Sequence, residues 1–169
     1  MSILAHDEII AAVKKGDIKI EPFDEANIGP GSIDLTLSNK FRVFSKANDV
    51  HDVTEETDYK KLTEIVTADS IVVSPGQTIL GITEEKITLA PSLCGWLEGR
   101  SRFARLGLLV HVSASFMQPG ISNRQVLEIS NMGQAPLRLH AGIRICQFIF
   151  QKMQGSAKYS GQFVDQIEP

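Results

Sequence analysis

The sequence is most informative at residues 99–113, which read GRSRFARLGLLVHVS. The first part of this stretch combines three arginines with a serine and two glycines, a composition that favours a tight basic turn. The second part, residues 109–113, alternates apolar and polar residues with the period of two that is typical of a half-buried strand. We therefore expect a turn that leads into a β-strand, with His111 in the middle of that strand.

Short apolar runs of the same kind recur on both sides of this stretch. Residues 33–37 and 126–129 alternate in the same way, and residues 145–150 form the largely apolar run expected of a buried strand. Turn-forming pairs such as Pro75-Gly76 and Pro119-Gly120 separate the runs. Many short strands divided by such turns predict a mainly β fold, either a sandwich, a jelly roll or a distorted barrel.

Three segments depart from the strand pattern. Residues 6–15 carry acidic residues in the first turn, lysines in the last turn and Gly16 after them, which predicts a short N-terminal helix. Residues 46–69 hold seven acidic against three basic residues and predict an exposed excursion with a short helix at residues 59–65. Residues 155–169 have few large apolar residues, so they are either a loose terminus or an arm that orders on a ligand.

Length and composition limit the class of protein. The 169 residues, 43% of them hydrophobic and 22% charged, fit a single globular domain over residues 1–169. No apolar run approaches the roughly 18 residues of a membrane span, and the N-terminus lacks the pattern of a signal peptide. Cys94 and Cys146 form no CxxC pair, so we expect a cytoplasmic protein with no membrane partner. The net charge of −3 argues against a general nucleic-acid partner.

The arginines are unevenly distributed. Six of the seven lie in residues 94–150, a stretch with no lysine and only two acidic residues, Glu98 and Glu128. A guanidinium is shaped to bind phosphate or carboxylate through two parallel hydrogen bonds. Together, Arg100, Arg102 and Arg105 favour a site for a small, highly charged anion, whereas any one of them can equally belong to a solvated face.

Glu128 and the histidines are the remaining candidates for chemistry. Glu128 lies in an apolar run, where it is either a solvated residue or, if it faces a pocket, a general base or acid. His111 taken alone is more typical of a core or interface residue. The four histidines and two cysteines show no zinc-site spacing, and the H-x-E and P-C-x-x-C motifs of zinc-dependent nucleobase deaminases are absent. The sequence therefore predicts no zinc.

Five segments together resemble one family. Residues 95–108, GWLEGRSRFARLGL, are similar to the dCTP deaminase signature GxxxGRSSxxRLGL. Four further segments of this chain resemble family elements and occur in the same order, namely PGSIDL at residues 30–35, VLEI at 126–129, GIRICQ at 142–147 and AKYSGQ at 157–162. The resemblance extends over about residues 8–162. It also places the chain in the wider dUTPase-like superfamily, whose dUTPases share the fold and the GRS motif.

The resemblance implies a distorted β-barrel or jelly roll of the dUTPase-like type, assembled as a homotrimer with active sites at subunit boundaries. It implies hydrolytic deamination of dCTP to dUTP and ammonia in pyrimidine deoxynucleotide biosynthesis, with Mg²⁺ bound only through the nucleotide triphosphate. Glu128 would activate the water, with Ser101 and Arg105 as further catalytic residues. The nucleotide-binding set that it implies is Arg100, Ser101, Arg102, Phe103, Ala104, Arg105, Ala114, Gln118, Val126, Leu127, Glu128, Gln147, Lys158 and Gln162.

The sequence departs from the family pattern at three places. Gln118 stands where the family has an acidic residue, which weakens a dUTPase interpretation and alters a sugar contact. Asn123 replaces a turn glycine, and we expect it to accept the left-handed backbone of that turn. The link from Phe150 to Lys158 is short and lacks a tyrosine. Two alternatives therefore stay open: a catalytically silent, trimeric nucleotide-binding relative, and a bifunctional dCTP deaminase/dUTPase that yields dUMP.

Overall fold

The computed structural model describes residues 2–45, 50–111, 113–164 and 166–169. Helix α1 (His6–Lys15) has the predicted boundaries and ends at Gly16, whose φ of 83° favours glycine. No helix in the described ranges is both long and apolar enough to span a membrane. The elements that follow are β1 (Ile18–Glu21), η1 (Glu25–Asn27), β2 (Ile33–Phe44), η2 (Tyr59–Leu62), β3 (Thr63–Thr67), β4 (Ser70–Val73), β5 (Thr78–Leu89), β6 (Leu93–Gly99), α2 (Ser101–Ala104), β7 (Leu108–Val110), β8 (Phe116–Met117), β9 (Ser122–Asn131), β10 (Leu137–His140) and β11 (Arg144–Lys152).

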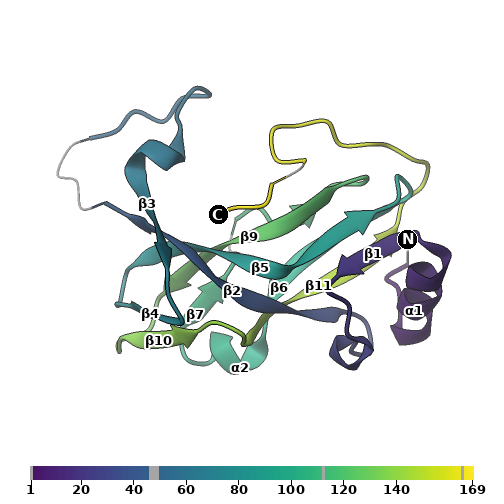
Figure 1. Ribbon diagram of the computed structural model, residues 1–169, viewed down its shortest axis with the longest axis horizontal. Coiled ribbons are helices and arrows are strands. Elements are labelled where there is room, and N and C mark those ends of the chain that lie inside the picture. The colour runs from purple at the N-terminus through teal and green to yellow at the C-terminus, as the bar shows by residue number, and fades with distance from the viewer. Residues whose placement is uncertain (1, 46–49, 112, 165) are drawn as a thin grey trace.

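Most of the strands of the described residues belong to one antiparallel sheet. Its strand order is β7-β9-β5-β2-β11-β6-β8, with β1 paired to β5 and β3 paired to β2, while β4 and β10 form a separate pair. Register shifts interrupt the pairings of β5 with β2, β5 with β9 and β2 with β11. Such irregularities bend strands and increase their twist. The sheet accordingly curls into a half-barrel (Figure 1), which confirms the mainly β fold with a short N-terminal helix.

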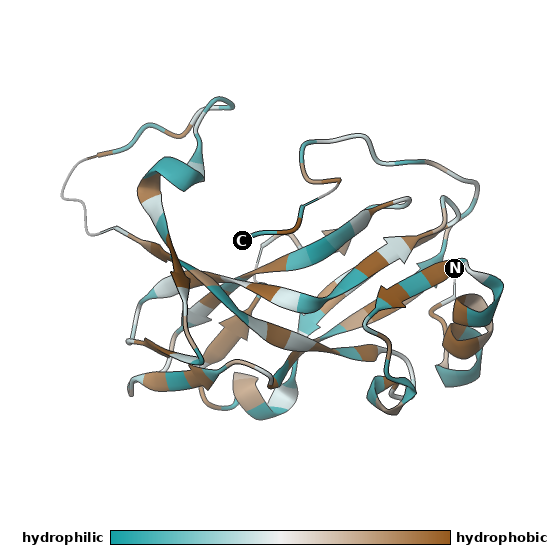
Figure 2. Cartoon of the chain, viewed as in Figure 1, coloured by the Kyte–Doolittle hydropathy of each residue, from teal (hydrophilic) through white to brown (hydrophobic). Residues whose placement is uncertain are grey.

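Apolar side chains fill the inside of the curl. Phe41, Phe148 and Phe150 are fully buried there, together with isoleucines and leucines of β2, β5 and β11. Hydrophobic and hydrophilic bands alternate along several strands (Figure 2). Strand β9 alternates buried and half-buried residues over its whole length. Because side chains point to opposite faces in turn, the half-buried set of β9, which includes Glu128, lies on the face away from the core.

Three expectations from the sequence are corrected. The strand predicted over residues 109–113 ends at Val110, and His111 adopts a left-handed φ of 59° instead of an extended conformation. The predicted helix at 59–65 stops at Leu62, because the residues that follow pair with β2 as strand β3. Asn123 takes no left-handed turn and is buried within β9. Val112 and residues 46–49, which also belonged to these predictions, lie outside the described residues.

Candidate active site

A cavity of about 450 Å³ lies beside β9. It is between the sheet and the chain after β11, residues 153–164 and 166–169, which we call the C-terminal segment. Strand β9 contributes Val126 and Glu128 to its lining, and the chain after β7 contributes His111, Ala114 and Gln118. Four of the residues that the family resemblance implies therefore meet at one place. Aromatic side chains complete much of the wall, namely Phe44, Tyr59, Phe116, Tyr159 and Phe163.

The register of the sheet explains why Glu128 reaches the cavity. Leu80 of β5 is paired with Glu128 of β9, and Arg42 of β2 is paired with Leu80. Side chains of directly paired residues share one face of an antiparallel sheet. Arg42, Leu80 and Glu128 thus form a row across three strands, with Arg42 about 10 Å from Glu128 at two strand spacings.

Glu128 is paired with His111. The Nδ1 atom of His111 lies 3.0 Å from Oε2 of Glu128, and its Nε2 lies 2.9 Å from the Ala114 carbonyl oxygen. The main-chain N–H of His111 also donates to the Glu128 carbonyl oxygen at 2.8 Å. This bond, together with the left-handed backbone of His111, turns the imidazole toward the carboxylate. The pair could not be predicted from the sequence, because it depends on the left-handed backbone of His111.

Charge attraction sets the protonation of the pair. Burial lowers the pKa of His111, but the Glu128 carboxylate, together with hydrogen bonds to the main chain of Ala114 and Val126, outweighs burial and holds the pKa above its ordinary range. Burial raises the pKa of Glu128, and the His111 imidazole outweighs it in the same way and holds that pKa below its ordinary range. Glu128 is therefore ionised at neutral pH, which is the form that a general base requires.

Both partners retain hydrogen-bonding capacity. The facing atoms, Nδ1 of His111 and Oε2 of Glu128, are buried and close, but neither makes an aligned hydrogen bond to another described residue. Buried polar atoms in native proteins are nearly always paired with protein, water or a ligand. The arrangement can therefore accept a water molecule or a polar ligand group beside the carboxylate.

Among the described residues, the main-chain pairing along the outer edge of β9 has a gap next to this pair. At one side of the gap the N–H of Arg124 donates to the Gln166 carbonyl oxygen at 3.0 Å, and at the other side Glu128 accepts from His111. Alternate residues of a strand direct their main-chain groups to the same edge, so Val126 directs its N–H and C=O into the gap. The side chain of Leu127, by contrast, is fully buried in the core, and Leu127 does not line the cavity.

The arginine turn, which we define as residues 100–105 and which contains helix α2, lies elsewhere. None of its residues lines the cavity, and Figure 1 shows α2 at the side of the sheet opposite the C-terminal segment. Phe103 anchors the turn against the core. The other predicted nucleotide-binding residues of α2 and the position after it are exposed, namely Ser101, Arg102, Ala104 and Arg105.

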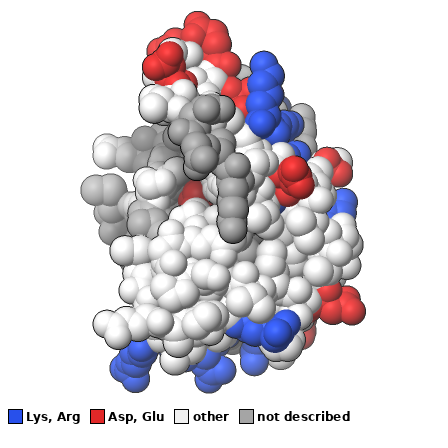
Figure 3. Space-filling model, turned by 90° about the vertical axis from the view of Figure 1, so that its left-hand side faces the viewer, with Lys and Arg blue, Asp and Glu red and all other residues white. Residues whose placement is uncertain are grey.

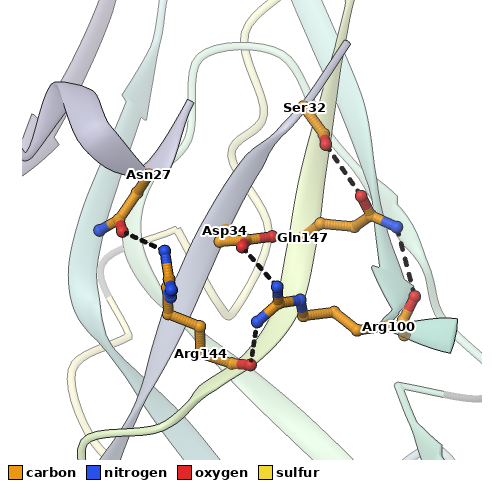
Figure 4. Close-up of polar contacts among 7 residues, drawn as sticks. Asn27, Ser32, Asp34, Arg100, Arg144 and Gln147 are labelled. Carbon is orange, nitrogen blue, oxygen red and sulfur yellow. Dashed lines mark hydrogen bonds and ion pairs between the residues drawn. The ribbon is translucent and has the colours of Figure 1, made fainter. Parts of the chain in front are cut away.

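Arg100 and Gln147 are engaged within the chain (Figure 4). Arg100 forms an ion pair with Asp34 at 2.9 Å and donates to the Arg144 carbonyl oxygen at 2.8 Å. Gln147 accepts from the Ser32 hydroxyl at 2.8 Å and donates to the Gly99 carbonyl oxygen at 3.3 Å. These contacts fix the start of the arginine turn to β2 and β11. The partner of Arg100 lies in the PGSIDL segment, which the sequence had singled out without this role.

The two remaining predicted residues lie on the C-terminal segment. Gln162 lines a second cavity of about 490 Å³, which shares Tyr59, Phe163 and Gln166 with the first. Lys158 is exposed and packs against Gly120, next to the hydrogen bond between the Tyr159 N–H and the Pro119 carbonyl oxygen. These contacts dock the segment on the rest of the chain.

The described residues offer few groups for a resident metal ion. Nowhere among them do three His, Cys, Asp or Glu side chains gather closely enough to bind one. Cys94 and Cys146 are buried and form no disulfide.

The curled antiparallel sheet and its cavity define a β-barrel-like protein with a pocket of a size that suits small ligands. A family model described as dCTP deaminase-like matches residues 3–153, and the chain belongs to this family. It is 41% identical over 165 residues to a Marinomonas protein named dCTP deaminase, with 91% of this chain and 85% of the relative covered. It is 36% identical over 177 residues to a Parafrankia protein named dCTP deaminase, dUMP-forming, with 99% and 88% covered.

A solved structure has the same fold. The crystal structure of 2′-deoxycytidine 5′-triphosphate deaminase from Agrobacterium tumefaciens matches with a TM-score of 0.70 at 22% sequence identity. The match covers 89% of this chain and 48% of the solved chain, so the present chain corresponds to about half of that protein's length. At this identity the likeness supports the fold.

Proposed function

We propose that the chain catalyses the hydrolytic deamination of dCTP to dUTP and ammonia, a step that supplies dUMP and dTTP. The observation that carries the proposal is the ionised Glu128 in the cavity, paired with His111 and placed where the resemblance requires a general base. The names of the Marinomonas and Parafrankia relatives support the same substrate.

The chemistry fits a single carboxylate. Water must lose a proton as it attacks the ring carbon that bears the amine, and the departing ammonia must gain one. Glu128 takes the first proton and returns it to the leaving nitrogen, a role worth about 10²–10⁴ in rate. Val126 directs its main-chain groups toward the pyrimidine edge, and the Ala114 carbonyl oxygen, next to His111, orients the water.

The phosphates need a second copy of the chain. Because the arginine turn is remote from the cavity of its own chain, we propose a homotrimer in which Ser101, Arg102 and Arg105 complete the cavity of a neighbour. An exposed apolar patch beside the turn supports association, since Leu106, Leu109 and Met132 are 57%, 37% and 67% exposed. The middle of the face shown in Figure 3 is also largely free of charge. Apolar, weakly charged surfaces are typical of subunit contacts.

Mg²⁺ would enter with the substrate. The described residues lack a three-ligand cluster, and Mg²⁺ is commonly held by substrate phosphates and water with few protein ligands. When bound, the ion would neutralise part of the triphosphate charge. The proposed proton transfers are carried out by Glu128, and no zinc takes part in them.

An alternative function is that the same chain also hydrolyses dUTP to dUMP. The names of several relatives, the Parafrankia protein among them, include this product. Gln118 in the cavity weighs against it, because an amide is a poorer base for water than the acidic residue it replaces. The deciding experiment incubates purified protein with dCTP and Mg²⁺ and separates dUTP, dUMP, pyrophosphate and ammonia. Ammonia with dUTP supports the deaminase, ammonia with dUMP and pyrophosphate supports the bifunctional enzyme, and tight dCTP binding with no ammonia supports a silent relative.

A further inference from the structure

Two segments that lie outside the sheet close the cavity. One is η2, which contributes Tyr59, and the other is the C-terminal segment, which contributes Tyr159, Phe163 and Gln166. In Figure 1 the C-terminal segment crosses above β9 and ends beside β2. Both segments contact one residue that does not line the cavity, Arg42 of β2.

Arg42 is a buried cation with three kinds of partner. Its Nη1 donates to the Thr63 hydroxyl at 3.1 Å, and its Nε donates to the Pro169 carbonyl oxygen. Its guanidinium carbon lies 5.8 Å from the centre of the Tyr59 ring. Only 7% of Arg42 is exposed. A planar guanidinium can donate in several directions while it stacks on an aromatic ring, which the single ammonium of lysine cannot reproduce.

The two segments are also joined to each other and to β9. The Gln166 side chain donates to the Tyr59 hydroxyl at 3.5 Å, and its carbonyl oxygen accepts from the Arg124 N–H. The Asn123 side chain donates to the Phe163 carbonyl oxygen at 2.7 Å. These bonds place the C-terminal segment along the open edge of β9, immediately before the gap at Val126.

We infer that Arg42 is a positioning residue for the proposed reaction, because it fastens Tyr59 and the C-terminal segment over the cavity. The inference rests on the proposed function. Contacts that hold Tyr59 and the C-terminal segment in place over the cavity lower the entropic cost of ordering them around the substrate. Arg42 is two strands from Glu128 and touches no reacting group, so its loss weakens substrate binding and leaves the chemical step unchanged.

The test compares Arg42→Lys with Arg138→Lys, an exposed arginine whose side-chain contact is a long one to Ser70. For Arg42→Lys we expect KM for dCTP to rise about tenfold, equivalent to about 1.4 kcal/mol, while kcat stays within about twofold. Peptides that contain Ser122 and Arg124 should exchange amide hydrogen faster, because the C-terminal segment protects these two N–H groups. Peptides of β11, and every property of Arg138→Lys, should match the wild type.

A second variant keeps the test decisive if Arg42→Lys folds poorly. Tyr59→Leu removes the ring from a residue outside the core, and it should raise KM in the same way. The effects of Arg42→Lys and Tyr59→Leu should be less than additive, since both act through one contact.

Each contrary outcome overturns the inference. A fall in kcat at constant KM would make Arg42 part of the chemistry, and faster exchange throughout the sheet would make it a purely structural residue. Faster exchange at Ser122 and Arg124 with unchanged KM would show that Tyr59 and the C-terminal segment do not help to retain substrate. If the wild type fails to deaminate dCTP, the proposed function fails instead. The exchange experiment needs no substrate and still decides whether Arg42 fastens the segment.

Discussion

The cavity beside β9 and the arginine turn differ in how much of their chemistry is complete within one chain. In the cavity, Glu128 and His111 lie 3.0 Å apart and each shifts the pKa of the other. In the turn, Arg102 and Arg105 are exposed, whereas Arg100 has an acidic partner, Asp34, the only one found for these three arginines among the described residues. Proton transfer requires a pre-positioned and partly buried base, which one chain provides. Phosphate binding requires cations that reach a ligand. Arg124 lines the cavity, but the arginine turn is on the other side of the sheet.

The largest effect is expected from the cavity. Glu128→Gln keeps the shape of the side chain but removes the base, so kcat should fall at least about a hundredfold while dCTP binding persists. Steady-state kinetics and calorimetric titration with dCTP measure the two quantities. Turnover close to that of the wild type would remove Glu128 from the mechanism and make the comparison meaningless.

The next effect is expected from the turn. Arg105→Lys keeps the charge but loses the planar donor arrangement, so activity should fall about tenfold or more without a change in oligomeric state. The control is Arg138→Lys, which should be nearly silent because exposed cations contribute little. Equal, harmless effects of the two substitutions would show that the arginine turn is an ordinary basic surface.

Mixing the two variants tests whether the cavity of one chain and the arginine turn of another form one site. If the turn of one copy completes the cavity of another, trimers mixed from Glu128→Gln and Arg105→Lys subunits contain some sites with both wild-type halves. Subunits unfolded together and refolded should therefore recover activity that neither variant has alone. A mixture no more active than its components would place both halves of the site in the same chain.

Metal removal distinguishes Mg²⁺ that binds through the substrate from a metal ion that is bound by the protein itself. A chelator should lower the activity severalfold, because the triphosphate charge is then unscreened, and added Mg²⁺ should restore it. Zinc should not substitute for Mg²⁺. Stoichiometric zinc in active protein, with turnover that depends on it, would overturn the proposed mechanism.

The sequence predicted local features better than long-range ones. Helix α1 and strand β11 were predictable because their patterns are complete within a few residues. Strand β3 was not, because its pairing with β2 overrides the local pattern. In the site, Glu128 stood out as an acid in an apolar run. Its pairing with His111 could not be predicted, because it depends on the left-handed backbone of His111, which no local pattern indicated. The Asp34–Arg100 ion pair joins residues far apart in the chain and needed the fold.

The smallest effect tests the Glu128–His111 pair through stability. Its stabilisation is present in full between the ordinary pKa values of the two groups, 4.5 for Glu and 6.5 for His. It is lost as the pH rises through the raised pKa of His111, and also as the pH falls through the lowered pKa of Glu128. His111→Asn removes the titrating ring while keeping a residue that tolerates the left-handed backbone.

A partly exposed pair of this kind is worth on the order of 1 kcal/mol, which shifts Tm by about 2–4 °C in a domain of this length. Thermal unfolding followed by circular dichroism should therefore show His111→Asn less stable than the wild type by this amount near pH 5.5. The difference should shrink toward zero well above neutral pH, where the wild-type imidazole is uncharged. In a Glu128→Gln background the pH-dependent part of the difference should disappear, because the partner charge is gone. A difference that is constant with pH would show that His111 serves as packing, and the cavity would then lack the paired charge that distinguishes it from the turn.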